Sequence, residues 1–236
     1  MTHYSRVLSM KQELPFLQVF FDIDGTLLLA GGVGRRVIEN IVQERYGIQN
    51  ALRDIRLHGN TDPRILEETA RTHAPEDTAI FGVYLKMRFL ECMPQAINGN
   101  CRLLPYVQET LQRLNMMGVP MGIVTGNYLE CAEAKLRDVN IRNYFTRGLY
   151  TATLHPERME ILRIAINETG VPPERTLYVG DTPWDVQAAH ACGCSVLALA
   201  TSLYSAGSLT VEGAHGTAVD MRVLAYGKCD FLFKGN

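Results

Sequence analysis

The feature that most constrains the fold is an alternation of short apolar runs and amphipathic stretches along the 236-residue chain. Apolar runs of strand length, typical of strands buried on both faces of a parallel sheet, occur at 17–23, 119–125, 144–151, 176–180 and 195–200. Helical patterns separate them: one opens at Pro105 and ends at Gly118, and another opens at Pro156 and ends at Gly170. This order predicts parallel strands joined by right-handed crossovers, so we expect a doubly wound α/β sheet.

The alternation stops between about Gly31 and Arg102. Three helical patterns, at 33–46, 63–72 and 75–93, follow one another there without a convincing strand. Glycine-rich residues 31–34 lead into this interval, and the polar residues 98–100 lead out of it. We therefore predict a helical cap at 31–102, inserted into a sheet core formed by 14–30 and 103–236. A strand-like run at 228–233, in the tail at 225–236, receives no role.

Composition narrows the classes of partner. A net charge of -2 and an isoelectric point near 6.3 leave no broad basic face for a nucleic-acid backbone, so we expect no nucleic-acid partner. No run approaches a membrane span and residues 1–21 lack the pattern of a signal peptide, so we expect no membrane partner. The six scattered cysteines favour free thiols, and the expected location is the cytoplasm. The oligomeric state stays open.

Two acids mark the end of the first predicted strand. The apolar run ends in Asp22 and Asp24, and a turn residue, Gly25, follows them. In an open α/β sheet the ligand crevice lies at the carboxyl ends of the strands, which is where these acids would be. One carboxylate can act as a covalent nucleophile while another serves as general acid and then as base. The alternative is a solvated acidic turn.

The second predicted strand end offers groups that suit phosphoryl oxygens. Thr125 supplies a hydroxyl, Gly126 a backbone N–H and Asn127 an amide, directly before a helical pattern at 128–137. The alternative is that Thr125 or Asn127 simply caps that helix.

A third strand end is acidic again. Asp181 follows the apolar run at 176–180, and Asp185 stands four residues later at the start of a helix. Carboxylate oxygens are the ligands of hard cations such as Mg²⁺. The alternative for Asp185 is capping of its helix.

Together, these strand ends resemble the first, second and fourth motifs of the haloacid dehalogenase superfamily. The matching segments are Asp-Ile-Asp-Gly-Thr at 22–26, Thr-Gly-Asn at 125–127 and Gly-Asp-Thr-Pro-Trp-Asp at 180–185. Within that superfamily, the chain looks like the phosphoglycolate phosphatase-like branch, which has a Rossmann-like core and a helical cap. The segment Gly-Asn-Thr-Asp at 59–62 also resembles a cap segment of this branch.

The resemblance implies catalytic roles. Asp22 would be the nucleophile that forms an aspartyl phosphate, and Asp24 would protonate the leaving alcohol and later activate water. Thr125 would hold a phosphoryl oxygen, with Gly126 and Asn127 beside it as substrate-binding residues.

The resemblance also implies a metal site. Mg²⁺ would be bound by Asp22, the backbone carbonyl of Asp24 and Asp181. Asp185 would belong to the same site and support either the metal or the basic residue.

One position departs from the family pattern. The third motif usually supplies a lysine shortly after the third core strand, and no lysine stands there. Arg158 is our candidate replacement because a guanidinium is always charged and suits phosphate. Its alternative is a solvated residue in the first turn of a helix. Lys135 is a second option, although it lies about two helical turns beyond Asn127.

The predicted function is hydrolysis of a small phosphate monoester by a magnesium-dependent phosphatase. Asn60 and Thr61 of the cap, with His58 and Arg64 nearby, are the expected contacts to a small phosphorylated metabolite. A phosphosugar mutase of the same superfamily and a noncatalytic binding protein on this fold remain alternatives. A dehalogenase is less favoured because that chemistry does not require a general acid at Asp24.

Overall fold

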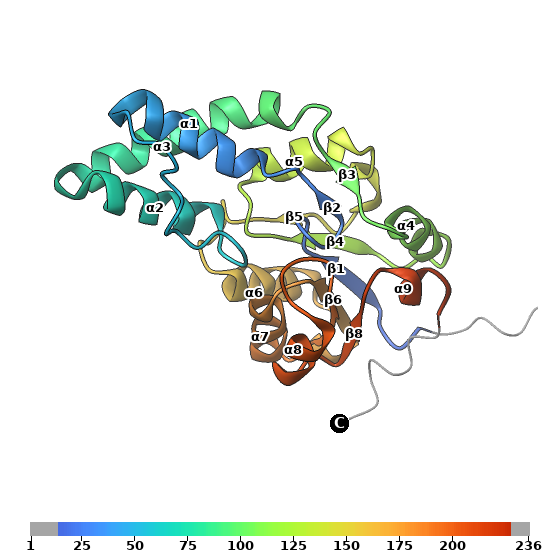
Figure 1. Cartoon of the computed structure of the whole chain (residues 1–236). Coiled ribbons are helices and arrows are strands. Elements are labelled where there is room, and N and C mark those ends of the chain that lie inside the picture. Colours follow the sequence, from blue (N-terminus) through green and yellow to red (C-terminus); the bar gives the residue numbers. More distant parts are fainter. Residues whose placement is uncertain (1–13, 228–236) are drawn as a thin grey trace, which may run out of the picture.

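The computed structural model describes residues 14–227, and its centre is a six-stranded sheet in the order β5-β4-β1-β6-β7-β8 (Figure 1). All neighbouring pairs in this sheet are parallel. The strands are β1 (Gln18–Phe21), β4 (Met121–Val124), β5 (Leu149–Tyr150), β6 (Thr176–Gly180), β7 (Ser195–Leu199) and β8 (Gly216–Ala218). The predicted α/β class is therefore confirmed.

Helices cover both faces of the sheet, which explains the near-continuous apolar character of its strands. One face packs against α6 (Arg158–Thr169), α7 (Pro183–Cys192) and α8 (Ala206–Val211), which lie together below the sheet in Figure 1. The other packs against α4 (Val107–Met116), α5 (Leu129–Asp138) and α9 (Arg222–Tyr226). Successive residues of β1 alternate between the two cores: Phe20 points to the first, whereas Val19 and Phe21 point to the second.

The segment between Leu29 and Arg102 contains three helices, α1 (Val33–Tyr46), α2 (Asp62–His73) and α3 (Thr78–Ile97), and the 3₁₀ turn η2 (Pro75–Asp77). Helix α3 packs on α1, α2 and α5. The two ends of this segment are joined by β2 (Leu28–Leu29) and β3 (Arg102–Leu103), a short antiparallel pair that the sequence analysis missed. The predicted cap, residues 31–102, begins two residues after β2 and ends at the first residue of β3.

Two predicted elements differ from the structure. The run at 144–151 is mostly not a strand: Arg142–Tyr144 form a 3₁₀ turn (η3) and only Leu149–Tyr150 pair with the sheet. Gly148, at φ 105°, turns the chain just before β5, and Phe145 is buried as core rather than paired as strand. The helix expected at 75–93 continues through Pro94, because burial of Met93 and Ile97 outweighs the lost N–H.

Smaller features complete the described part of the chain. A third 3₁₀ turn, η4 (Pro173–Arg175), precedes β6, and β8 was not predicted because it is short and only half-buried. The strand-like run at 228–233 lies outside the described residues. Within residues 14–227, no helix has the length and apolar character needed to cross a membrane.

Candidate active site

A cavity of about 430 Å³ lies at the carboxyl ends of β1, β4 and β6. Its sheet side is lined by the predicted residues Asp22, Asp24, Thr125, Gly126, Asn127, Arg158 and Asp181. The helical insertion contributes apolar side chains on the opposite side, among them Ile38, Ile65 and Phe89. Strand ends from distant parts of the sequence and the inserted helices thus enclose one space, as expected for an open α/β sheet.

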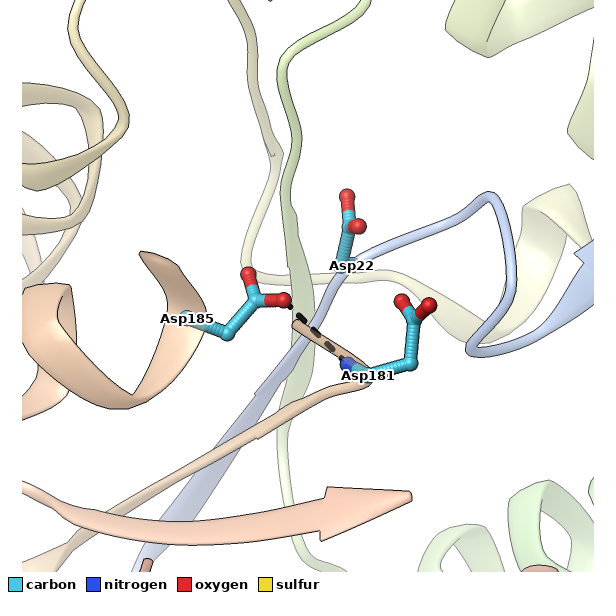
Figure 2. Close-up of side chains that lie close together, drawn as sticks. All are labelled: Asp22, Asp181 and Asp185. Carbon is cyan, nitrogen blue, oxygen red and sulfur yellow. Dashed lines mark hydrogen bonds between the residues drawn. The ribbon is translucent and has the colours of Figure 1, made fainter. Parts of the chain in front are cut away.

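Three carboxylates lie close together (Figure 2), and two of them, Asp22 and Asp181, line this cavity. Asp22 follows β1 and Asp181 follows β6, so their side chains project side by side because the two strands are parallel neighbours. Asp185 comes from the first turn of α7. One oxygen from each residue lies within 4.8 Å of the others, and all three side chains are buried.

Asp22 and Asp181 hold protons more tightly than an exposed aspartate does. Burial raises the pKa of Asp22 from 3.8 to about 6; Arg158 opposes this rise, whereas Asp185 and Asp24 add to it. Burial, followed by the charges of Asp185 and Asp22, raises the pKa of Asp181 well above its usual range. Such a cluster is short of positive charge, and a bound divalent cation would reverse the shifts.

The donor set fits a hard cation. Asp22 Oδ1 is buried and, apart from an ion pair with Arg158 Nη1 at 3.1 Å, has no hydrogen-bond partner among residues 14–227. Thr26 donates a 3.0 Å hydrogen bond to Asp181 Oδ1 and so orients that carboxylate. Gly25 has φ 79°, and a Cβ there would lie 2.3 Å from Asp181 Oδ2, so only glycine allows Asp181 to come this close.

Asp185 has a different environment. Its Oδ2 accepts hydrogen bonds from the backbone N–H groups of Asp181 and Thr182 and from the Thr182 hydroxyl, at 3.2, 2.9 and 2.7 Å. Its Oδ1 accepts from Tyr178 and Arg158, at 2.8 and 2.9 Å. The capping alternative is therefore observed as a capping box with Thr182. Because both oxygens already have donors, the geometry favours a supporting role over direct metal binding.

Arg158, the first residue of α6, is buried rather than solvated, so the alternative reading of this residue is wrong. Its Nη1 lies 3.1 Å from Asp22 Oδ1 and 2.9 Å from Asp185 Oδ1. Burial alone would lower the pKa of Arg158, but Asp185 and Asp22 raise it well above its usual value. Its buried Nε has no hydrogen-bond partner among the described residues, which leaves a donor for an anion.

Lys135 also reaches the site. Its Nζ lies 2.5 Å from Asp24 Oδ2 and 3.0 Å from Asn127 Oδ1, and only 5% of the residue is exposed. Burial would lower the pKa of Lys135, but Asp24 and Asp62 raise it. The site thus contains both cations that the sequence analysis weighed against each other, each on a different aspartate. Lys135 follows buried Cys131 by one helical turn, a spacing that could have placed it on the inner face of α5.

The second strand end lines the cavity. Thr125 is buried, and its hydroxyl accepts a 3.4 Å hydrogen bond from the N–H of Asn127. The N-cap of α5 is Tyr128, so the alternative that Thr125 or Asn127 caps this helix is not observed.

The predicted cap contacts lie in different places. Asn60 and His58 line the cavity. Thr61 does not line it; instead, its hydroxyl donates a 2.7 Å hydrogen bond to the Pro156 carbonyl. Arg64 forms ion pairs with Glu67 and Glu157 outside it.

Sequence reasoning missed Asp62, which joins α2 to the site. Its carboxylate accepts a 2.8 Å hydrogen bond from the backbone N–H of Tyr128. Burial raises the pKa of Asp62 from 3.8 to about 6, while Lys135 and the Tyr128 N–H act in the opposite direction. Its place in the segment at 59–62, singled out by the family resemblance, was the available signal.

Comparison with known proteins agrees with this geometry. A model of the haloacid dehalogenase-like hydrolases matches residues 18–193, and the chain belongs to that family. The phosphoglycolate phosphatase of Pectobacterium atrosepticum is 28% identical over 180 residues, covering 74% of this chain and 76% of that protein. The phosphoglycolate phosphatase of Pseudomonas putida is 26% identical over 228 residues, covering 90% of this chain and 79% of that protein.

Solved structures share the fold. A predicted phosphoglycolate phosphatase from Haemophilus somnus superimposes with a TM-score of 0.74 at 21% identity, covering 89% of this chain and 96% of that one. CbbY from Rhodobacter sphaeroides, in complex with phosphate, gives a TM-score of 0.72 at 21% identity, covering 92% of this chain and 99% of that one. The family, the fold and the hydrolase class predicted from the sequence are all confirmed.

Proposed function

We propose that the protein is a magnesium-dependent phosphatase that hydrolyses a small phosphate monoester through an aspartyl phosphate on Asp22. One observation carries the proposal: Asp22 lies buried in the lining of the cavity, and its Oδ1 forms an ion pair with Arg158 at 3.1 Å. A buried carboxylate beside a fixed cation suits attack on a charged phosphoryl group. The phosphoglycolate phosphatases among its relatives support this class of substrate.

In the first half of the reaction, a carboxylate oxygen of Asp22 forms a bond to phosphorus while the bond from phosphorus to the alcohol oxygen breaks. The carboxyl group of Asp24 gives its proton to the departing alcohol oxygen. Arg158 offsets the charge of the phosphoryl oxygens, and the Thr125 hydroxyl and the Asn127 amide orient them.

In the second half, Asp24, now a carboxylate, takes a proton from a water molecule. The oxygen of that water forms a bond to phosphorus, and the bond from phosphorus to Asp22 breaks. Inorganic phosphate leaves, Asp22 is again a carboxylate and Asp24 is again protonated, so the enzyme returns to its starting state.

The residues present fit Mg²⁺, with Asp22, the backbone carbonyl of Asp24 and Asp181 as protein ligands and Asp185 holding Asp181 and Arg158 in place. When bound, the ion would supply Lewis-acid stabilisation of the phosphoryl oxygens and allow the neighbouring carboxylates to be ionised together.

We further propose that residues 31–102 act as a cap that closes over the sheet and excludes bulk water. The apolar contribution of α1–α3 to the cavity supports this division. A cytoplasmic location is part of the proposal, since the cysteines among the described residues are free thiols.

A screen of phosphorylated metabolites, with phosphoglycolate included, tests the function. Free phosphate is measured with Mg²⁺, with a chelator and with the ion restored. We expect magnesium-dependent release that is absent from the Asp22→Asn protein. Interconversion of sugar phosphate isomers without release would instead identify a mutase, and binding without turnover would identify a noncatalytic protein.

A further inference from the structure

Asp62 is the point at which the helical insertion meets the acid-base side of the site. It is the first residue of α2, and its backbone N–H donates a 2.7 Å hydrogen bond to the carbonyl of Gly126. Its Oδ2 accepts the N–H of Tyr128, the N-cap residue of α5. Both core partners therefore belong to the loop that follows β4.

A chain of polar contacts runs from Asp62 to Asp24. Asp62 Oδ1 lies 3.5 Å from the amide nitrogen of Asn127, and the amide oxygen of Asn127 accepts a 3.0 Å hydrogen bond from Lys135. Lys135 in turn contacts Asp24 Oδ2 at 2.5 Å. A residue of the insertion is thus connected to the proposed general acid through two side chains of the core.

The chemistry of the partners sets the direction of this chain. A carboxylate can only accept hydrogen bonds and an ammonium group can only donate them. The Asn127 amide between them must therefore turn its NH₂ toward Asp62 and its oxygen toward Lys135. Without the carboxylate of Asp62, no other member of this row of contacts accepts a hydrogen bond from the NH₂ of Asn127. The Asn127 amide can then turn, and its oxygen is no longer held toward Lys135.

We propose that Asp62 is a positioning residue that acts through Asn127 and Lys135 on Asp24, so that the acid-base group is held in place only when the insertion is closed on the sheet. This inference rests on the proposed phosphatase function. It does not extend to Asp22, because the hydrogen-bond and ion-pair partners of Arg158 within residues 14–227 are Asp22, Asp185 and Tyr178, all from the sheet core.

The leaving group of the substrate separates this role from a general effect on closure. Nitrophenolate departs without a proton, whereas an alkoxide needs one, so release of the leaving group depends on a well-placed Asp24 only for alkyl esters, although hydrolysis of the aspartyl phosphate depends on it for both. Release of the alcohol in a single turnover is therefore measured with p-nitrophenyl phosphate and with phosphoglycolate, for the wild type and for Asp62→Asn. We expect the rate of this step to fall about 10- to 100-fold for phosphoglycolate and to change less than about 3-fold for the nitrophenyl ester.

Arg64→Gln is the matched control. It removes the ion pair from α2 to Glu157, which also joins the insertion to the core but lies at the exposed rim. This variant should affect both esters equally and weakly. In a Lys135→Met background, Asp62→Asn should add no further selective loss, because both changes break the same chain.

Equal losses for the two esters in Asp62→Asn, or the same selective loss in Arg64→Gln, would overturn the inference while leaving the phosphatase function standing. A wild-type protein that releases phosphate from neither ester would overturn both. If Asp62→Asn does not fold, judged by circular dichroism, Asp62→Ser keeps an acceptor for Tyr128 and is subject to the same two outcomes.

Discussion

The site has two sides, each built around one aspartate and one buried cation. On the first side, Asp22 is paired with Arg158, and every partner comes from the sheet core. On the second side, Asp24 is paired with Lys135, and the contacts continue through Asn127 to Asp62 of the insertion. One side is therefore fixed by the core, whereas the other depends on how the insertion packs.

Exposure separates the two sides further. The side chain of Asp22 is 5% exposed, whereas that of Asp24 is 43% exposed. A nucleophile benefits from a fixed, water-poor position, whereas an acid-base group must exchange protons with the leaving group and with water. The difference supports the proposal that covalent chemistry belongs to the Asp22 side and proton transfer to the Asp24 side.

The largest expected effects come from replacing the aspartate of each side, Asp22 or Asp24, by asparagine. Asp22→Asn should abolish turnover of every ester, by at least about 10⁴-fold, because the amide keeps the shape and loses the nucleophile. Asp24→Asn should slow release of the alcohol about 10²- to 10⁴-fold for alkyl esters, and release of nitrophenolate from p-nitrophenyl phosphate much less. Steady-state kinetics of Asp22→Asn and single-turnover release of the alcohol by Asp24→Asn check this. Residual activity in purified Asp22→Asn, or equal losses for both esters in Asp24→Asn, would contradict the assignment.

Metal dependence should be confined to the Asp22 side. Asp181→Ala removes a hard oxygen ligand, so we expect the Mg²⁺ concentration for half-maximal activity to rise at least about 10-fold, or activity to be lost. Titration of Mg²⁺ after chelator treatment provides the measurement. Asp62→Asn is the control and should leave that concentration unchanged. Full activity of the wild type in excess chelator would exclude the metal site.

Replacing Arg158 and replacing Lys135 should have different effects on turnover. Arg158→Ala should lower kcat/KM for all esters by about 10²- to 10³-fold, since the Asp22 side loses its fixed positive charge. Arg158→Lys should recover part of this loss because a positive charge returns to the site. Lys135→Ala should act mainly on alkyl esters. Normal turnover by Arg158→Ala together with loss of all activity in Lys135→Ala would show that Lys135, rather than Arg158, supplies the positive charge that phosphoryl transfer requires.

The smallest effect concerns stability and pH. The pKa of Asp62 rises from 3.8 to about 6 in the folded protein, so the native state binds its proton more tightly than the unfolded chain does. The free energy of unfolding of the wild type should therefore fall, relative to Asp62→Asn, as pH rises through this interval. The relative change should be at most about 3 kcal/mol and complete above pH 6. Urea denaturation of both proteins at pH 4.5 and pH 7.5 measures it, and a pH-independent difference would contradict the shift.

Much of the first side follows from local pattern. Apolar runs that end in Asp22 and Asp181 predict strands, and parallel strands of one sheet bring their carboxyl ends to the same edge. Thr125 was placed correctly at the cavity for the same reason. These predictions succeed because the strand period and the handedness of crossovers are local rules that hold whatever the rest of the chain does. The run at 144–151 failed because apolar character reports burial, and Phe145 is buried without being in a strand.

The second side was decided by tertiary structure. Lys135 meets Asp24 across 111 positions of sequence, and Asp62 meets Tyr128 across 66. Such contacts depend on which face α5 turns toward the sheet and on how α2 is seated over the loop after β4. Local spacing can place Lys135 on the inner face of α5, but it does not pair Lys135 with Asp24 or Asp62 with Tyr128, because long-range packing sets the relative position of the insertion and the sheet.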